Sequence, residues 1–320
     1  MDTYAIGTHN LSTNKHFLIN LLKPTMFNIK HIQLLSETEI TSLYTRPEFN
    51  YDEQQLYFTL NEHEFAILNR YSNTRTKVYF ILQLGYFKAK QKFFKFRFED
   101  ARTDVKYIVF NFFKHTDTIL SGRISRNYTN QQKDDILKLF EYQEWSSKFE
   151  SQTTSRICEL LRYYPKSHSA LRQLLDYFSN QKIIVPSYRK LQDMFTAAYS
   201  TEEKRLGTIV SSTPKDKQQQ LLSLIDRDDG ISQLNIIRSD QKDFKYTAVR
   251  SEIKKAQKIA ELHEFAKSFI PTLKLSKNAV RYYADLVEQY SASRLRRLSR
   301  LQQLLHVICF IYHRYQQIYG

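Results

Sequence analysis

The chain has 320 residues, with 48 Lys and Arg against 33 Asp and Glu and a formal net charge of +15, a balance that favours a polyanionic partner such as nucleic acid. Its two cysteines, Cys158 and Cys309, are too few and too far apart for a disulfide framework or a structural zinc site. No apolar run approaches the roughly 20 residues that span a bilayer, so we expect a soluble protein of a reducing, intracellular compartment, built from two or three domains.

Periodic runs of Leu, Ile, Phe and Tyr recur along the chain, while Gly and Pro number only 6 each. This pattern predicts an all-α fold. Ser36-Glu-Thr-Glu39 fits a capping box, and Asn61 is placed to cap the next helix. In this part of the chain, helices are predicted over about 36–44, 61–71 and 74–88, and from Asp100 or Thr103 through Phe112. The aromatic residues of 93–98 form a loop or short extended piece whose rings are expected in the core.

Farther along, three short helices with tight connections are typical of a helix-turn-helix module. One is stopped by Pro165, and Ser187 is placed to cap another. The predicted helices lie within 129–142, over 151–163, around 171–178, from Ser187 through Phe195 and from Thr201 through Ile209. After a soft boundary near 230, long helical patterns run over 247–269 and 278–319. The fold class is therefore all-α, with tandem small helical domains followed by long helices.

The charge is unevenly placed. Residues 71–128 hold 12 Lys and Arg against 4 Asp and Glu, and residues 241–320 hold 15 against 6. Two separated basic blocks suit two contact surfaces. The alternative is that these cations are solvated side chains on ordinary helix faces.

The first basic block offers two kinds of DNA ligand, because cations at phosphate spacing position a protein and a few side chains at base edges specify the site. A solvated loop is the alternative for its lysines. The phosphate candidates are Arg75, Lys77, Lys88, Lys90, Lys92, Lys95 and Arg97, and the candidates near a groove are Arg123, Arg126, Asn127 and Tyr128.

A predicted recognition helix begins near Ser187, where amino-terminal side chains and free amides face a groove. Arg and Gln there are suited to bidentate contacts with guanine or adenine edges, although Arg189 and Lys190 alternatively face water. Arg205 is a further phosphate candidate, with an ion pair to Glu202 within its own helix as an equal alternative. The candidates at the helix start are Ser187, Tyr188, Arg189, Lys190 and Gln192.

Catalytic signatures are missing from the sequence. It has no Gly-rich phosphate loop and no HExxH helix, and His306 and His313 have no third metal ligand at a suitable spacing. We expect no catalytic residue, cofactor or metal. Leucines between Leu295 and Leu305 form a packing stripe flanked by arginines, which suits a helix of a bundle as well as DNA contact.

Several motifs together resemble the amino-terminal, DUF4158-type DNA-binding region of Tn3-family transposases. Each is weakly specific alone, but their order covers roughly residues 32–318. They are LSETEI (35–40), YFTL (57–60), RTKVYFILQLGYFKAK (75–90), IVPSYRKLQ (184–192), TEEKRL (201–206) and LQQLLHVICFIYHRYQQ (301–317).

The resemblance implies sequence-specific binding to the terminal inverted repeats of a transposon in double-stranded DNA, at the nucleoid of a bacterial cytoplasm. In that family a later RNase-H-like domain carries three metal-binding carboxylates, so we expect a truncated or split transposase that is not itself an enzyme. Its expected partners are DNA, an intact transposase or separate catalytic half, and a second copy. The alternatives are a metal-dependent nuclease subunit with an unrecognised site and a non-specific basic nucleic-acid-binding protein.

The same resemblance divides the chain into four expected parts. They are a variable extension at 1–31, a first helical DNA-binding domain at 32–150, a second, helix-turn-helix-like DNA-binding domain at 151–230, and the start of a helical dimerisation region at 231–320.

Overall fold

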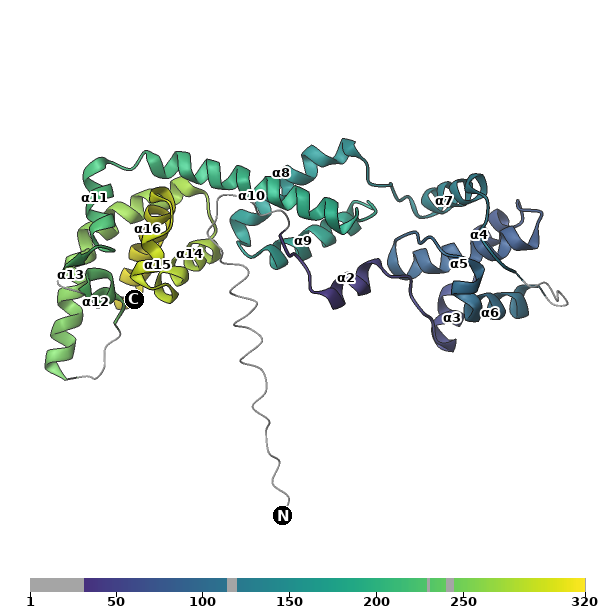
Figure 1. The fold of residues 1–320 in the computed structure, drawn as a ribbon, viewed down its shortest axis with the longest axis horizontal. Coiled ribbons are helices and arrows are strands. Elements are labelled where there is room, and N and C mark those ends of the chain that lie inside the picture. Colours follow the sequence, from purple (N-terminus) through teal and green to yellow (C-terminus); the bar gives the residue numbers. More distant parts are fainter. Residues whose placement is uncertain (1–31, 114–119, 229–230, 240–244, 320) are drawn as a thin grey trace, which may run out of the picture. The chain divides into compact units, whose positions relative to one another are not determined.

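The computed structural model describes residues 32–113, 120–228, 231–239 and 245–319 (Figure 1), so the predicted extension at 1–31 lies outside the described residues. Within these ranges the fold is all-α, as predicted. The exception is a short antiparallel hairpin, in which β1 (Arg227–Asp228) pairs with β2 (Ile231–Ser232).

The chain divides into two compact units. Of the described residues, those within 33–160 and 166–195 form the amino-terminal unit, and those within 161–165 and 196–320 form the carboxy-terminal unit. The predicted division into functional parts at 150 and 230 stays a prediction, because compactness does not reveal which segments bind DNA.

The amino-terminal unit begins with three short helices, each preceded by a capping box. The Ser36 and Asn61 caps confirm the prediction, since each side chain accepts from the amide three residues on and a glutamate returns the bond. Asn50 caps α3, a helix that the sequence pattern did not predict. The elements are α2 (Glu37–Tyr44), α3 (Tyr51–Phe58), α4 (Glu62–Leu68), α5 (Thr74–Lys90), η1 (Phe98–Ala101), α6 (Arg102–Phe112), α7 (Arg126–Phe140), η2 (Ser147–Phe149), most of α8 (Glu150–Tyr163), α9 (Ser167–Asn180) and the start of α10 (Tyr188–Ser211).

Helix α5 is the centre of this unit. All its side chains from Val78 to Phe87 are buried, and it contacts α3, α4, α6 and α7 (Figure 1). The aromatic segment that follows lies in the same core, with Phe94, Phe96 and Phe98 at most 8% exposed. Gln83 Nε2 donates to the carbonyl of Phe94 at 2.8 Å. The expectation that these rings enter the core is confirmed for Phe94 and Phe96, while Phe93 is half-buried and packs against the same core.

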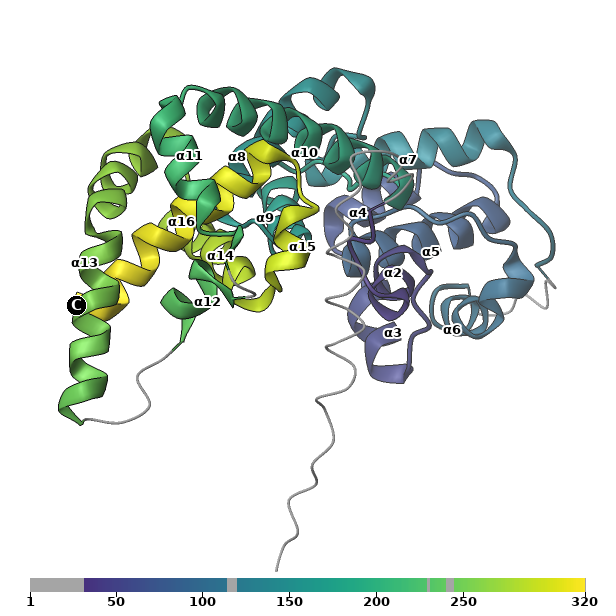
Figure 2. The same cartoon turned by 60° about the vertical axis from the view of Figure 1, so that its left-hand side comes forward.

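The carboxy-terminal unit is built around its last helix. Its elements after α10 are α11 (Lys215–Ser223), the β1–β2 hairpin, α12 (Gln233–Arg238), α13 (Tyr246–Phe269), η3 (Ile270–Leu273), α14 (Lys277–Gln289), α15 (Ala292–Arg296) and α16 (Arg300–Tyr319). Helix α16 lies alongside α13 and α14 (Figure 2).

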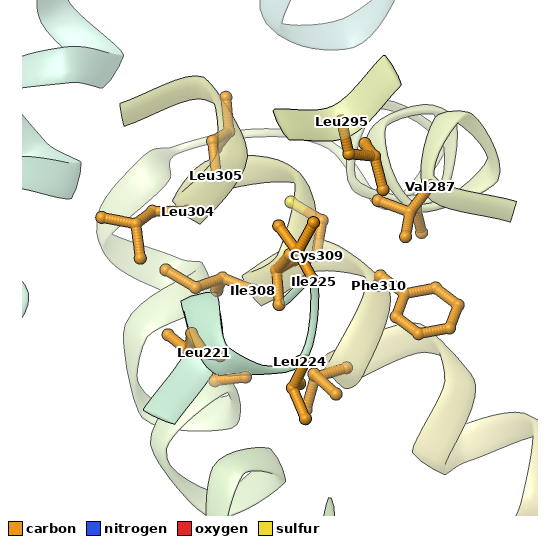
Figure 3. Close-up of a cluster of buried hydrophobic side chains, with 14 of the residues drawn as sticks. Leu221, Leu224, Ile225, Val287, Leu295, Leu304, Leu305, Ile308, Cys309 and Phe310 are labelled. Carbon is orange, nitrogen blue, oxygen red and sulfur yellow. The ribbon is translucent and has the colours of Figure 1, made fainter. Parts of the chain in front are cut away.

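The predicted leucine stripe forms much of this second core. Leu304, Leu305 and Ile308 of α16 gather with Leu221 of α11 and with Leu295 of α15 (Figure 3). Residues 304–311 are all buried. Apart from Leu301, which is 39% exposed, the stripe therefore packs within the unit, as a helix of a bundle does.

Several predicted helix boundaries are wrong: α7 begins at Arg126, before the expected range of 129–142, and two longer patterns are divided differently. Thr201 does not begin a helix, because its hydroxyl donates back to the carbonyl of Ala197 at 2.9 Å and α10 continues unbroken to Ser211. The helical pattern over 278–319 is divided into three helices, because Ser291 caps α15 and Ser299 accepts from the Gln302 amide in α16. Within the described part of the chain, no helix has both the length and the apolarity needed to cross a membrane.

Candidate nucleic-acid interface

Two segments distant in sequence meet at the turn that leads into α7. The Phe98 amide donates to the Gly122 carbonyl at 3.1 Å, and the Gly122 amide donates to the Glu99 carboxylate at 2.9 and 3.1 Å. Gly122 has a φ of 73°, a conformation that glycine adopts at little cost. The segment around Phe98 is thereby fixed against the turn that leads into α7.

Arg75, in the first turn of α5, contacts both of these segments. Its Nη2 donates to the carbonyl of Arg123 at 3.0 Å, and its guanidinium lies 5.0 Å from the centre of the Phe98 ring. Arg75 is half-buried. This predicted phosphate ligand therefore has a structural role, and it adds positive charge beneath the surface.

Three arginines lie exposed around this point, and we call Arg97, Arg123 and Arg126 the arginine corner. Arg126 is the first residue of α7, whose first turn contains no acidic side chain. Asn127 and Tyr128 are exposed beside it. Because helix amino termini carry partial positive charge, the guanidinium groups and the helix start favour the same ligand, an anionic group such as a phosphate.

The lysines at the end of α5 bind a carboxylate and backbone carbonyls of the same unit. Lys88 forms a 2.8 Å ion pair with the buried Glu64 and donates to the Thr59 carbonyl at 2.7 Å. Lys90 donates to the carbonyl of Ser42 at 3.0 Å. These contacts satisfy helix-end carbonyls and a buried carboxylate. Lys77, which is half-buried, and Lys95, which is exposed, keep their places as phosphate candidates.

Lys92 is not a surface residue, which corrects its assignment as a phosphate ligand. The residue is 8% exposed. Its ammonium lies 3.7 Å from the centre of the Tyr44 ring and donates to the Val185 carbonyl at 3.3 Å. Burial lowers the pKa of Lys92 to about 8, because removal from water disfavours the charged form.

At the start of α10, the predicted candidates separate into two groups. The Ser187 hydroxyl accepts from the Lys190 amide at 3.3 Å, which confirms it as the helix cap. The Lys190 ammonium pairs with Glu150 at 2.6 Å and lies 5.5 Å from the Trp145 ring. Arg189 is exposed, so it is the cation here that extends into solvent.

The remaining two candidates of this helix start are less exposed. Gln192 is half-buried. The Tyr188 hydroxyl accepts hydrogen bonds from the amides of Leu34 and Leu35, at 2.9 and 3.2 Å. Tyr188 is thus bound to the beginning of the amino-terminal unit.

Arg205 forms the ion pair that was its alternative interpretation. Its Nε lies 2.7 Å from a carboxylate oxygen of Glu202, and its Nη1 donates to the carbonyl of Leu273 at 2.9 Å. Arg162 approaches the same carboxylate at 2.7 Å. Arg205 therefore belongs to the interior of the carboxy-terminal unit and is removed from the DNA-binding candidates.

Two exposed cations of the first basic block were missed. Arg102 and Lys106 lie four residues apart on α6, so they share a helix face. Their spacing within the basic block is the signal that would have found them.

The described ranges contain no group of three or more His, Cys, Asp or Glu side chains arranged to hold a metal ion. His306 lies within the carboxy-terminal core, where burial lowers its pKa to about 4. His313 lies 3.2 Å from the Gln317 amide nitrogen. Neither histidine has the surroundings of a metal ligand.

Comparison with known proteins gives one family. Residues 34–198 match the family described as "Domain of unknown function (DUF4158)", and this range includes nearly all of the amino-terminal unit. No curated protein matches the chain. With about half of its residues matched, the chain belongs to the DUF4158 family.

Proposed function

We propose that this protein is the sequence-specific DNA-binding part of a Tn3-family transposase and that it recognises the terminal inverted repeats of a transposon. The family description states no function, so the proposal combines the ordered motif resemblance over 32–318 with the surface chemistry. The observation that carries it is the arginine corner, where three exposed arginines lie on segments that meet at the turn before α7 and on the first residue of that helix.

The arginine corner suits the phosphate backbone. Guanidinium groups are permanently charged and form paired hydrogen bonds with phosphate oxygens. Arg97 and Arg123 belong to segments joined through Phe98 and Gly122, so their backbones are already positioned. A surface whose backbone is already positioned loses less conformational entropy on binding than a flexible segment does.

Base recognition is assigned to the start of α10. Arg189 is exposed on the first turn of this 24-residue helix, the position from which recognition helices contact base edges. An arginine that binds guanine in a bidentate manner discriminates against the wrong base by about 1–3 kcal/mol. The two surfaces therefore have different roles: the arginine corner supplies affinity and Arg189 supplies selectivity.

A salt-titrated binding assay tests this division of roles. Wild type, Arg126→Ala and Arg189→Ala are compared on a duplex carrying the terminal repeat and on a scrambled duplex of equal length. Arg126→Ala should weaken binding to both duplexes and reduce the slope of log K against log salt by about 1. Arg189→Ala should reduce the preference for the repeat about tenfold.

Arg281→Ala is the matched control, because Arg281 is an exposed arginine on α14 that pairs with Asp285 at 3.8 Å. It should change neither quantity. Equal affinity of the wild type for both duplexes would refute the proposal and leave a non-specific basic nucleic-acid-binding protein. Magnesium-dependent nicking by the purified protein would instead support the nuclease alternative.

A further inference from the structure

The loop that leads into α10, residues 181–187, is bound to the segment between α7 and α8. The Gln143 amide donates to the Lys182 carbonyl at 2.7 Å, and the Ile184 amide donates back to the Gln143 carbonyl at 2.9 Å. Ile184 is also buried in the core around α5. The first half of the loop is therefore anchored by main-chain hydrogen bonds and by an apolar side chain.

The second half of the loop is held through two successive carbonyls. Lys92 Nζ donates to the carbonyl of Val185 at 3.3 Å, and the Tyr44 hydroxyl donates to that of Pro186 at 2.7 Å. The two donors also touch each other, because the Lys92 ammonium lies 3.7 Å from the centre of the Tyr44 ring. A buried ammonium that lacked these partners would be strongly unfavourable.

Tyr188, the first residue of α10, completes the arrangement. Its hydroxyl accepts from the amides of Leu34 and Leu35, which are 1% and 5% exposed. Its ring meets Tyr44 edge-on at 6.4 Å. Since buried amides need an acceptor, Tyr188 ties the helix start to the segment before α2.

We infer that Tyr44, Lys92 and Tyr188 are positioning residues that fix the first turn of α10 against the core around α5 and so determine where Arg189 meets DNA. We call these three residues the α10 clamp. This inference rests on the proposed function and assigns to Tyr188 and Lys92 a role other than DNA contact, because their polar groups are committed to the protein.

The clamp should affect selectivity more than general affinity. A bidentate contact with a base edge requires the arginine to be held close to the geometry in which both hydrogen bonds form. Phosphate contacts tolerate displacement and carry no sequence information. A protein with a loosened clamp should therefore still bind DNA through the arginine corner. It should distinguish poorly between the repeat and a scrambled sequence.

The first measurement is made without DNA, on the full chain. Tyr188→Phe keeps the ring and removes the acceptor, so hydrogen exchange of the Leu34 and Leu35 amides should accelerate about tenfold or more. Amides of Leu82 and Leu84, which are fully buried in α5, report whether the whole unit has loosened and should not change. Tyr51→Phe, at an exposed tyrosine of the same unit, is the matched control.

The second measurement is the ratio of affinities for the repeat and the scrambled duplex. Tyr188→Phe combined with Tyr44→Phe should reduce this ratio about tenfold while changing the affinity for the scrambled duplex less than about twofold. Faster exchange with an unchanged ratio would overturn the positioning role.

Unchanged exchange of Leu34 and Leu35 in Tyr188→Phe would overturn the clamp itself, whatever the DNA result. A wild-type protein that does not prefer the repeat would overturn the proposed function, and with it the effect of the clamp on selectivity. Because the exchange measurement involves no DNA, the two failures are distinguishable.

Discussion

Replacement of Gly85 by alanine tests the packing of the amino-terminal unit most directly. Gly85 lies in the fully buried part of α5, and a Cβ atom added there would lie 2.5 Å from two carbons of the Phe58 ring and 3.2 Å from the Tyr57 carbonyl oxygen. Phe58 is 0% exposed, so its ring is enclosed by the core and cannot move aside into solvent. Glycine here permits the close approach of α3 and α5.

The expected magnitude follows from two opposing effects. Alanine favours a helix interior over glycine by about 1 kcal/mol. Overpacking of a filled core costs about 1–3 kcal/mol, and a contact of 2.5 Å with a confined ring belongs at the upper end of that range. Gly85→Ala should therefore destabilise the unit by about 1–2 kcal/mol, or about 2–8 °C in Tm.

Gly207→Ala is the matched control. Gly207 also lies inside a helix, but its added Cβ would meet only Leu301 Cδ1 at 3.4 Å, so the helix preference should prevail and stability should rise by up to about 1 kcal/mol. Urea unfolding followed by circular dichroism measures both variants. A Gly85→Ala protein as stable as wild type would refute the packing argument, as would a destabilised Gly207→Ala protein.

Three other changes have defined outcomes. Tyr86→Phe removes the hydroxyl that donates to the buried Asp104 carboxylate at 2.6 Å. The free energy of unfolding should fall by about 1–3 kcal/mol, and an unchanged midpoint of urea unfolding would contradict this expectation. Glu202→Gln replaces a carboxylate that is 8% exposed and shared by two arginines, so the free energy of unfolding should fall by about 1.5–3 kcal/mol, the range for hydrogen bonds to charged groups. Glu159→Gln, in an exposed pair, should change the free energy of unfolding by less than about 1 kcal/mol. Burial lowers the pKa of His306 from 6.5 to about 4, so the unfolded state binds the proton more tightly than the folded state does. The contribution of neutral His306 to the free energy of unfolding should be fully present above pH 6.5, and the free energy of unfolding should fall by about 3 kcal/mol by pH 4. His306→Gln should lack this part of the pH dependence in urea unfolding at several pH values, and an equal pH dependence in the variant would exclude His306 as its source.

Local features of the fold could be predicted from the sequence because their causes lie within one helical turn. The Ser36 and Asn61 caps each bond to an amide three residues away, and the apolar run of α5 indicates a buried helix by its composition. Asn50 has the same capping geometry with Glu53. We missed it because the helix that it begins has no clear apolar stripe.

The candidate interface was predicted only in part. Lys92 and Lys95 lie three residues apart in one basic run, yet the first is buried against Tyr44 and the second is exposed. The pattern of charges does not distinguish them. Their environments depend on partners elsewhere in the chain.

By itself, then, the sequence determined the all-α class, the Ser36, Asn61 and Ser187 caps and the total positive charge, since each follows from short-range geometry or composition. Only the tertiary structure decided which cations face solvent. The partners of Lys88 and Tyr188 are 24 and 154 residues away, and contacts over such separations form only when the helices pack. Arg97, Arg123 and Arg126 are exposed, and the segments that carry Arg97 and Arg123 are joined through backbone groups and Arg75.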